Sequence, residues 1–168
     1  MKNFYYFLIS FILLINLSSC SGYKSIFTSS NLEFKIAEHT LVGNKKLGNQ
    51  IYSQLYNLFK SNKTENKTIN IVIDTKKKRQ PTVKNNTGKI LEYKIILTTS
   101  IVFSDYLTKE IILNYNSNLS SSYKVQDQYS KTKSVENRNT DDLINRTFQD
   151  LLIQISQINI SKHKLVHH

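Results

Sequence analysis

The chain contains few of the residues from which catalytic loops and covalent cross-links are built. Its 168 residues include four glycines, one proline and one cysteine. The glycines stand apart, at positions 22, 43, 48 and 88, so the sequence has no glycine-rich loop to bind a phosphate. It also has no nucleophile elbow. Because one cysteine cannot form a disulfide within the chain, the fold must be held together by packing alone.

Histidines are scarce as well, and their positions do not suit a metal. They are His39, His163, His167 and His168. A metal site needs ligands gathered on a rigid element, such as an i, i+4 pair on a helix. Asp141 and Asp142 are adjacent and point apart by about 100° on a helix, so a capping role explains them. We therefore expect no catalytic site, no metal site and no cofactor.

The N-terminus carries an apolar run from Phe4 to Leu17. A membrane-spanning helix needs roughly 20 apolar residues, so this run is too short to span comfortably. It follows Lys2 and ends in small polar residues, an order typical of a secretory signal. We predict a signal peptide over residues 1–19.

The end of this run, Leu17-Ser18-Ser19-Cys20, resembles the bacterial lipobox. The resemblance implies that the Cys20 thiol takes a diacylglycerol, that cleavage occurs before Cys20 and that the new amine is acylated. Two or more acyl chains make a stable anchor, whereas one holds a protein only marginally. The alternative is a buried structural cysteine after an uncleaved anchor. Inner-membrane retention signals of enterobacteria-like systems carry Asp directly after the cysteine, where this chain has Ser21. We therefore expect an anchor in the outer membrane, on its periplasmic side.

The charge is strongly positive, with 23 Lys and Arg against 12 Asp and Glu. Inside a cell such a balance would suggest nucleic acid. An exported, tethered protein rarely meets DNA, so we expect lipid phosphates, lipopolysaccharide or a carboxylate-lined partner instead, and no nucleic acid. A second explanation is AT-rich codon usage, which favours Lys, Asn, Ile and Tyr alike.

Hydrophobic periodicity predicts six elements. Alternation marks strands, and apolar residues at spacings of three and four mark helices. The predicted elements are a strand over 31–41, a helix over 44–60, a strand beginning near 69, a strand over 89–104, a strand from 111 that weakens into 120–122, and a helix from an N-cap at 139–142 to about 160. The run 76–81, with its four basic residues and Pro81, is predicted to be a loop. Ile90, Ile96 and Val102 on the second face of the strand 89–104 predict that this strand is covered on both sides.

The element order is β-α-β-β-β-α, which predicts a two-layer α+β sandwich of four mixed strands packed by two helices. The crossover through the first helix should make the first two strands parallel and leave the others antiparallel. The chain then comprises a signal peptide (1–19), a lipidated tether (20–30), one α+β domain (31–160) and a loose tail (161–168). In this topology Lys76 to Arg79 should lie beside Tyr123 and Lys124, at the end of the domain opposite the tether.

The order, the lipobox and several short segments together resemble the LptE family of lipopolysaccharide-assembly lipoproteins. The segments are Leu47-Gly48-Asn49-Gln50-Ile51-Tyr52-Ser53-Gln54-Leu55, Ser122-Tyr123-Lys124 and Tyr129-Ser130. The sequence departs from the family in having Ser21-Gly22-Tyr23 after the cysteine and an Asn- and Ile-rich final helix. The resemblance implies an outer-membrane lipoprotein that plugs an LptD-like β-barrel, helps it assemble and helps deliver lipopolysaccharide to the outer leaflet. It implies no catalysis and no cofactor.

Lipid A phosphates accept charge-assisted hydrogen bonds from Lys and Arg. We therefore take the basic residues of the predicted end as the candidate lipopolysaccharide site: Lys76, Lys77, Lys78, Arg79 and Lys124. The alternative for any one of them is a solvated charge that keeps the protein soluble. Two other functions stay open: a free-standing periplasmic carrier that binds an anionic amphiphile or envelope polymer, and a small hydrolase, for which the sequence nominates no cluster of titratable groups.

Overall fold

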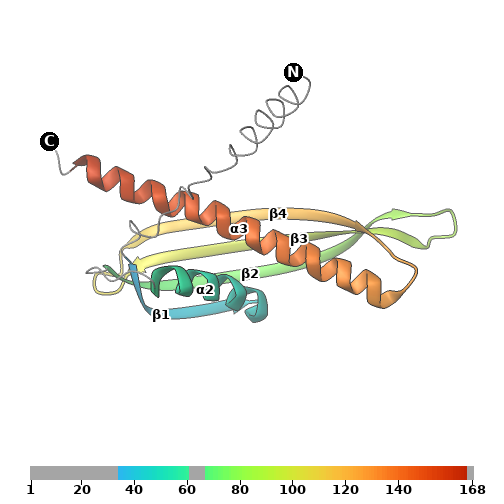
Figure 1. Cartoon of the computed structure of the whole chain (residues 1–168), viewed down its shortest axis with the longest axis horizontal. Helices are drawn as coiled ribbons and strands as arrows, with labels where there is room; N and C mark the ends of the chain where they lie inside the picture. Colours follow the sequence, from blue (N-terminus) through green and yellow to red (C-terminus); the bar gives the residue numbers. More distant parts are fainter. Residues whose placement is uncertain (1–33, 61–66, 166–168) are drawn as a thin grey trace, which may run out of the picture.

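The computed structural model describes residues 34–60 and 67–165, and the side chains of this range as far as residue 158. The predicted signal peptide, Cys20 and the tether lie outside these residues. The elements are β1 (Phe34–Gly43), α2 (Lys45–Lys60), β2 (Lys67–Lys84), β3 (Ile90–Asp105), β4 (Ile111–Lys124) and α3 (Tyr129–Leu165). The predicted α+β order is confirmed (Figure 1).

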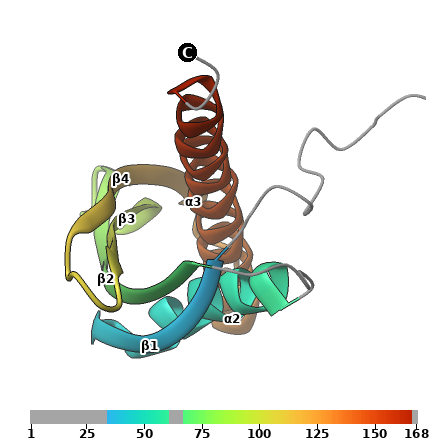
Figure 2. The ribbon, with the colours of Figure 1, turned by 90° about the vertical axis from the view of Figure 1, so that its left-hand side faces the viewer.

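The four strands form one sheet in the order β1-β2-β3-β4. β1 and β2 are parallel, and the β2–β3 and β3–β4 pairs are antiparallel, as predicted from the crossover through α2. Both helices cover the same face of the sheet, which curls partway around them (Figure 2). The domain is therefore a two-layer sandwich with one helix-covered face and one open face.

The core lies between the sheet and the two helices. Alternate residues of β2 and β3, among them Ile71, Ile73 and Ile101, are fully or almost fully buried against the apolar stripes of α2 and α3. The predicted stripe of α2 is confirmed at Leu47, Ile51, Leu55 and Phe59, and that of α3 at Leu143, Ile144, Leu151, Leu152 and Ile155. At one end Phe34, Phe59 and Phe103 pack edge to face with centroids 5.8–6.4 Å apart.

The prediction of a loop at 76–81 is wrong, because β2 continues through it to Lys84. The apolar alternation that marks a strand stops at Ile73, although the backbone ladder to β3 does not. Pro81 is tolerated because the ladder shifts register next to it, between Pro81 and Val83. The basic run therefore alternates between the two faces of the sheet.

The predicted start of the last helix, at 139–142, is also wrong. α3 begins at Tyr129, and Asp141 and Asp142 lie in its interior rather than in its first turn. Hydrophobic periodicity did not predict the first turns of α3, because the residues buried there are polar: Thr132, Glu136 and Thr140. At its other end α3 runs to Leu165, into the segment expected to be a loose tail.

The open face of the sheet contradicts the prediction that β3 is covered on both sides. Ile96 and Val102 point away from the helices and are only half-buried, and Val72 is exposed. Most of their neighbours on this face of β3 and β4 are asparagines, serines and threonines. Among the described residues, neither helix is both long enough and apolar enough to cross a membrane.

The turn between β1 and α2 depends on Gly43, which has φ +69°. A Cβ there would collide with the carbonyl oxygen of Thr75 and lie 2.7 Å from Asp74 Oδ1. The next residue, Asn44, donates its N–H to the same Thr75 oxygen (2.7 Å) and its side chain caps α2 by accepting from Leu47 N–H (3.2 Å).

We predict that Gly43→Ala lowers the free energy of unfolding by about 2 kcal/mol or more, since positive φ alone costs about 1–2 kcal/mol and the collision adds to it. Urea unfolding measures the change. Gly88→Ala is the matched control, because Gly88 also has positive φ (+82°) but has open space where the Cβ would lie. An equal loss in both variants would contradict the role of the Thr75 contact.

Candidate functional site

The candidate site is the end of the domain where β2, β3 and β4 continue beyond the end of the edge strand β1. β1 ends at Gly43, opposite Thr75, whereas β2 and β3 remain paired as far as Lys84 and Ile90. In this region the strand alternation of β2 places Lys77 and Arg79 on the helix-covered face. Lys76 and Lys78 lie on the open face.

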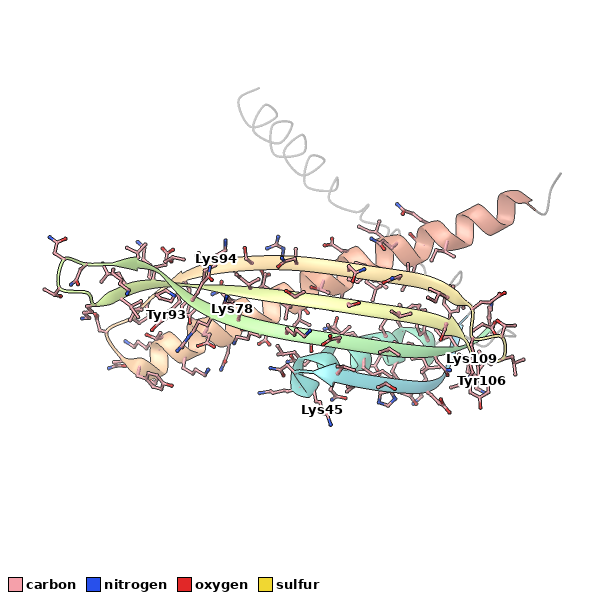
Figure 3. The ribbon with its side chains drawn as sticks, turned by 180° about the vertical axis from the view of Figure 1, so that it is seen from behind. Lys45, Lys78, Tyr93, Lys94, Tyr106 and Lys109 are labelled. Atoms are coloured by element: carbon pink, nitrogen blue, oxygen red, sulfur yellow. The ribbon has the colours of Figure 1, made fainter. Side chains whose placement is uncertain are left out.

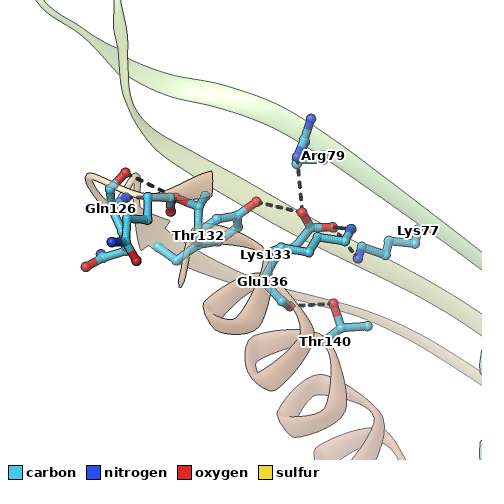
Figure 4. Close-up of polar contacts among 9 residues, drawn as sticks. Lys77, Arg79, Gln126, Thr132, Lys133, Glu136 and Thr140 are labelled. Carbon is cyan, nitrogen blue, oxygen red and sulfur yellow. Dashed lines mark hydrogen bonds and ion pairs between the residues drawn. The ribbon is translucent and has the colours of Figure 1, made fainter. Parts of the chain in front are cut away.

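On the helix-covered face, Glu136 of α3 binds three cations. Its carboxylate accepts from Lys77 Nζ (2.7 Å), Arg79 Nη1 (3.1 Å) and Lys133 Nζ (3.3 Å), and from the Tyr123 hydroxyl (3.2 Å) (Figure 4). Only 4% of the Glu136 surface is exposed. We call these five residues the Glu136 cluster. It ties β2, β4 and α3 together beside Leu97 and Ile95, the buried β3 partners of Lys77 and Arg79.

Tyr93 of β3 extends the Glu136 cluster across the sheet. The guanidinium of Arg79 lies 4.5 Å from the ring centroid of Tyr93, a cation–π distance. Tyr93 in turn stacks on Tyr123, with centroids 6.0 Å apart. Arg79 is therefore held by a carboxylate and by an aromatic ring at once.

The acidity of Glu136 follows from these contacts. Burial alone would raise the pKa of its carboxyl, but the hydrogen bonds and charges of Lys77 and Lys133 outweigh burial and hold the pKa at about 2. Hydrogen bonding to Tyr123 contributes most to a raised pKa of Arg79. The Glu136 carboxylate therefore stays ionised at neutral pH, in contact with three cationic side chains.

On the open face, four lysines gather at the same end: Lys76, Lys78, Lys94 and Lys124. In the strand register, Lys94 of β3 lies opposite Gln80 of β2 and Ser122 of β4. Lys124 lies two residues further along β4, opposite Glu92 of β3. Figure 3 shows Lys78 and Lys94 near each other on this face. Lys76 lies 3.4 Å from Asp74, in an exposed ion pair. Within the part of the chain that the structure describes, Lys78, Lys94 and Lys124 have no carboxylate within ion-pair distance.

The predicted basic site is therefore divided into two sets. Lys77 and Arg79 are held by Glu136, and Lys76, Lys78 and Lys124 face solvent. The sequence reasoning missed Glu136, Tyr93 and Lys94. One signal for Glu136 was present: Thr132, Glu136 and Thr140 recur every four residues and continue the helical stripe that begins at Leu143.

A concave feature, separate from the basic end, lies between α2 and α3. This groove encloses about 340 Å³ and is lined by Asn49, Gln50, Ser53, Gln54, Asp141, Ile144 and Asn145. Hydrogen bonds cross between the helices there, from Gln50 to Asp141 (3.4 Å) and from Gln54 to Asn145 (3.2 Å). In the described ranges no three His, Cys, Asp or Glu side chains are grouped so that they could hold a metal ion.

Neither a family model nor a curated protein matches the chain. Solved structures do match. Lipoprotein B from Nitrosomonas europaea superposes with a TM-score of 0.57 at 18% identity, over 88% of this chain and 97% of that one. A minor lipoprotein from Acinetobacter baumannii gives a TM-score of 0.55 at 16% identity, over 76% and 93%.

The chain shares its fold with bacterial lipoproteins. This likeness is consistent with the LptE-like lipoprotein fold that the sequence resemblance implied. Both neighbours are described as lipoproteins.

We predict that Glu136→Gln lowers the free energy of unfolding by about 2 kcal/mol at pH 7. The lowered pKa corresponds to about 3 kcal/mol, which we reduce because Arg79 and Lys133 are partly exposed to solvent. Since the folded-state pKa lies below the unfolded value, the stabilisation is complete above about pH 5 and falls to less than half by about pH 3. Urea unfolding of both proteins across this range measures it.

The matched control is Glu38→Gln, on the exposed edge strand β1. It removes the same charge without a buried partner, so we expect a change within about 0.5 kcal/mol. A Glu136→Gln protein as stable as Glu38→Gln at pH 7 would refute the structural role of the Glu136 cluster.

Proposed function

We propose that this protein is an outer-membrane lipoprotein that plugs an LptD-like β-barrel translocon, helps it assemble and assists lipopolysaccharide insertion into the outer leaflet. The observation that carries the proposal is the open face of the sheet, on a fold shared with bacterial lipoproteins. Four of its lysines, Lys76, Lys78, Lys94 and Lys124, gather at one end, opposite the end where the described chain begins.

The composition of the open face fits the inside of a barrel. Asn114, Asn116, Asn118, Ser120 and Ser122 line the outward side of β4, and Thr98 and Ser100 line that of β3. Neutral amides and hydroxyls exchange hydrogen bonds with polar walls and with water. An interface inside a barrel therefore does not require the large apolar patch found in many other complexes.

The lipopolysaccharide site is assigned to the open-face lysines rather than to the whole basic run. Lys77 and Arg79 already neutralise the buried carboxylate of Glu136, so a phosphate that recruited Lys77 would have to compete with that ion pair, and one that contacted the partly exposed Arg79 would share it with Glu136. Lys78, Lys94 and Lys124 have uncommitted ammonium groups. Each can donate charge-assisted hydrogen bonds to lipid A phosphates, with Lys76 adding charge beside them.

A periplasmic carrier remains the second candidate, and the groove between α2 and α3 is the observation that favours it. Such a groove could take a hydroxyl-rich envelope polymer, which hydrogen-bonds to amides. Hydrogen bonds from Gln50 and Gln54 already bridge the groove, so a ligand would have to displace them.

We expect a C-terminally tagged copy, purified from detergent-solubilised outer membranes, to bring a large β-barrel protein with it at near-equal amount. Mass spectrometry of the eluate identifies the partner. Recovery of the protein alone, from membranes that contain intact barrels, would contradict the plug and favour the carrier.

We also expect the triple change of Lys78, Lys94 and Lys124 to Ser to weaken lipopolysaccharide binding about tenfold or more at matched salt, because each exposed lysine contributes on the order of 0.5–1 kcal/mol. The salt dependence should fall with it. The control removes three exposed lysines elsewhere, Lys35, Lys46 and Lys60, and should lose much less. Equal losses in the two triple variants would indicate nonspecific attraction to the net charge.

A further inference from the structure

The turn between β3 and β4 exposes three large apolar side chains within six residues. Leu107 is 83% exposed, Ile111 66% and Tyr106 38%. Single exposed apolar residues are common on soluble proteins, but a group of three at the tip of a turn indicates a surface that meets something apolar.

Hydrogen bonds hold this turn in one shape. Asp105 Oδ1 accepts from the N–H groups of Leu107 (2.9 Å) and Thr108 (3.0 Å), and Lys67 Nζ lies 3.0 Å from Asp105 Oδ2. The N–H of Tyr106 reaches across to the carbonyl oxygen of Thr68 (3.0 Å). The hydrogen bond from Thr108, followed by that from Lys67, lowers the pKa of Asp105 to about 2. The exposed Leu107 is thus presented by a rigid support.

The turn lies at the end of the domain where the described chain begins. Phe34, the first described residue, pairs with Lys67 and packs on Phe103, close to the start of the turn. Figure 3 shows Tyr106 and Lys109 at this end, far from Lys78 and Lys94. Residues 21–33 separate Phe34 from Cys20, and the 14 residue steps can reach about 50 Å at most when extended. A lipid at Cys20 would therefore keep this end near the membrane.

The chemistry of the turn fits the head-group region of a bilayer. Tyr and Lys are the residues that anchor proteins at membrane interfaces, where the ring stays half-buried and the ammonium reaches water. Lys109 Nζ lies 4.7 Å from the centroid of the Tyr106 ring. The formal charges of Lys67, Asp105, Lys109 and Glu110 cancel, so apolar insertion rather than attraction to anionic lipid would provide the contact.

We propose that the β3–β4 turn inserts Leu107 and Ile111 into the phospholipid leaflet that holds the Cys20 anchor. This inference rests on the anchoring part of the proposed function and does not depend on a barrel partner. The acyl chains supply most of the attachment. The turn adds a second contact point at high effective concentration, which sets the orientation of the domain on the membrane.

The test uses the absence of tryptophan from the chain. Leu107→Trp places the one tryptophan of the chain at the tip of the turn, where the exposed side chain leaves room for it and where it can be excited apart from the tyrosines. The full-length lipidated protein, its acylation confirmed by mass, is reconstituted into vesicles of phosphatidylethanolamine and phosphatidylglycerol, with and without brominated acyl chains. We expect blue-shifted emission and at least twofold quenching by the brominated lipid.

The matched control is Asn86→Trp, at the tip of the β2–β3 hairpin, at the opposite end of β3. Its emission should stay red-shifted and unquenched. If the Leu107→Trp protein is quenched no more than the Asn86→Trp protein, the proposal is wrong. Because the vesicles contain no barrel and the anchor is verified beforehand, this failure is distinct from a failure of the plug or of lipidation.

Discussion

The ion pairs between Glu136 and the cations of β2 are the interaction on which the far half of this domain depends. Where the apolar alternation of β2 ends, the inner face of the strand carries Lys77 and Arg79, and α3 still passes above it. Two cations under a helix would lose hydration without compensation. The buried carboxylate supplies that compensation, so β2 stays paired with the buried Leu97 and Ile95 of β3 and remains covered by α3.

This internal neutralisation also determines which charges remain for a partner. Because side chains alternate along β2, Lys77 and Arg79 lie on the helix-covered face and bind Glu136. Lys76 and Lys78 lie on the open face, which also carries Lys94 and Lys124. A dense basic run thus becomes a structural set and an exposed set, although the two are adjacent in sequence. At the opposite end of the domain, the charges around the exposed apolar turn cancel. The two ends therefore differ in character: one is polar and basic, and the other is neutral with exposed apolar side chains.

Much of the fold could be predicted because apolar periodicity reports packing directly. Ile69, Ile71 and Ile73, and the stripe from Leu47 to Phe59, alternate as a strand and a helix require. The predictions failed where burial is polar. Thr132, Glu136 and Thr140 occupy the buried face of α3. Lys77 and Arg79 occupy the helix-covered face of β2, so the apolar pattern stops before either element does. The prediction that β3 is covered on both sides failed for the opposite reason. Ile96 and Val102 are apolar, but they lie on the open face of the sheet.

The sequence alone determined the order of the elements, the parallel pairing of β1 and β2, and the basic character of one end, because these follow from local periodicity and chain connectivity. Only the tertiary structure decided which lysines are free. That outcome depends on a single carboxylate on α3, more than fifty residues away along the chain from Lys77 and Arg79. Contacts between elements so distant in sequence leave no periodic signal, and the geometry of packing alone selects the partners.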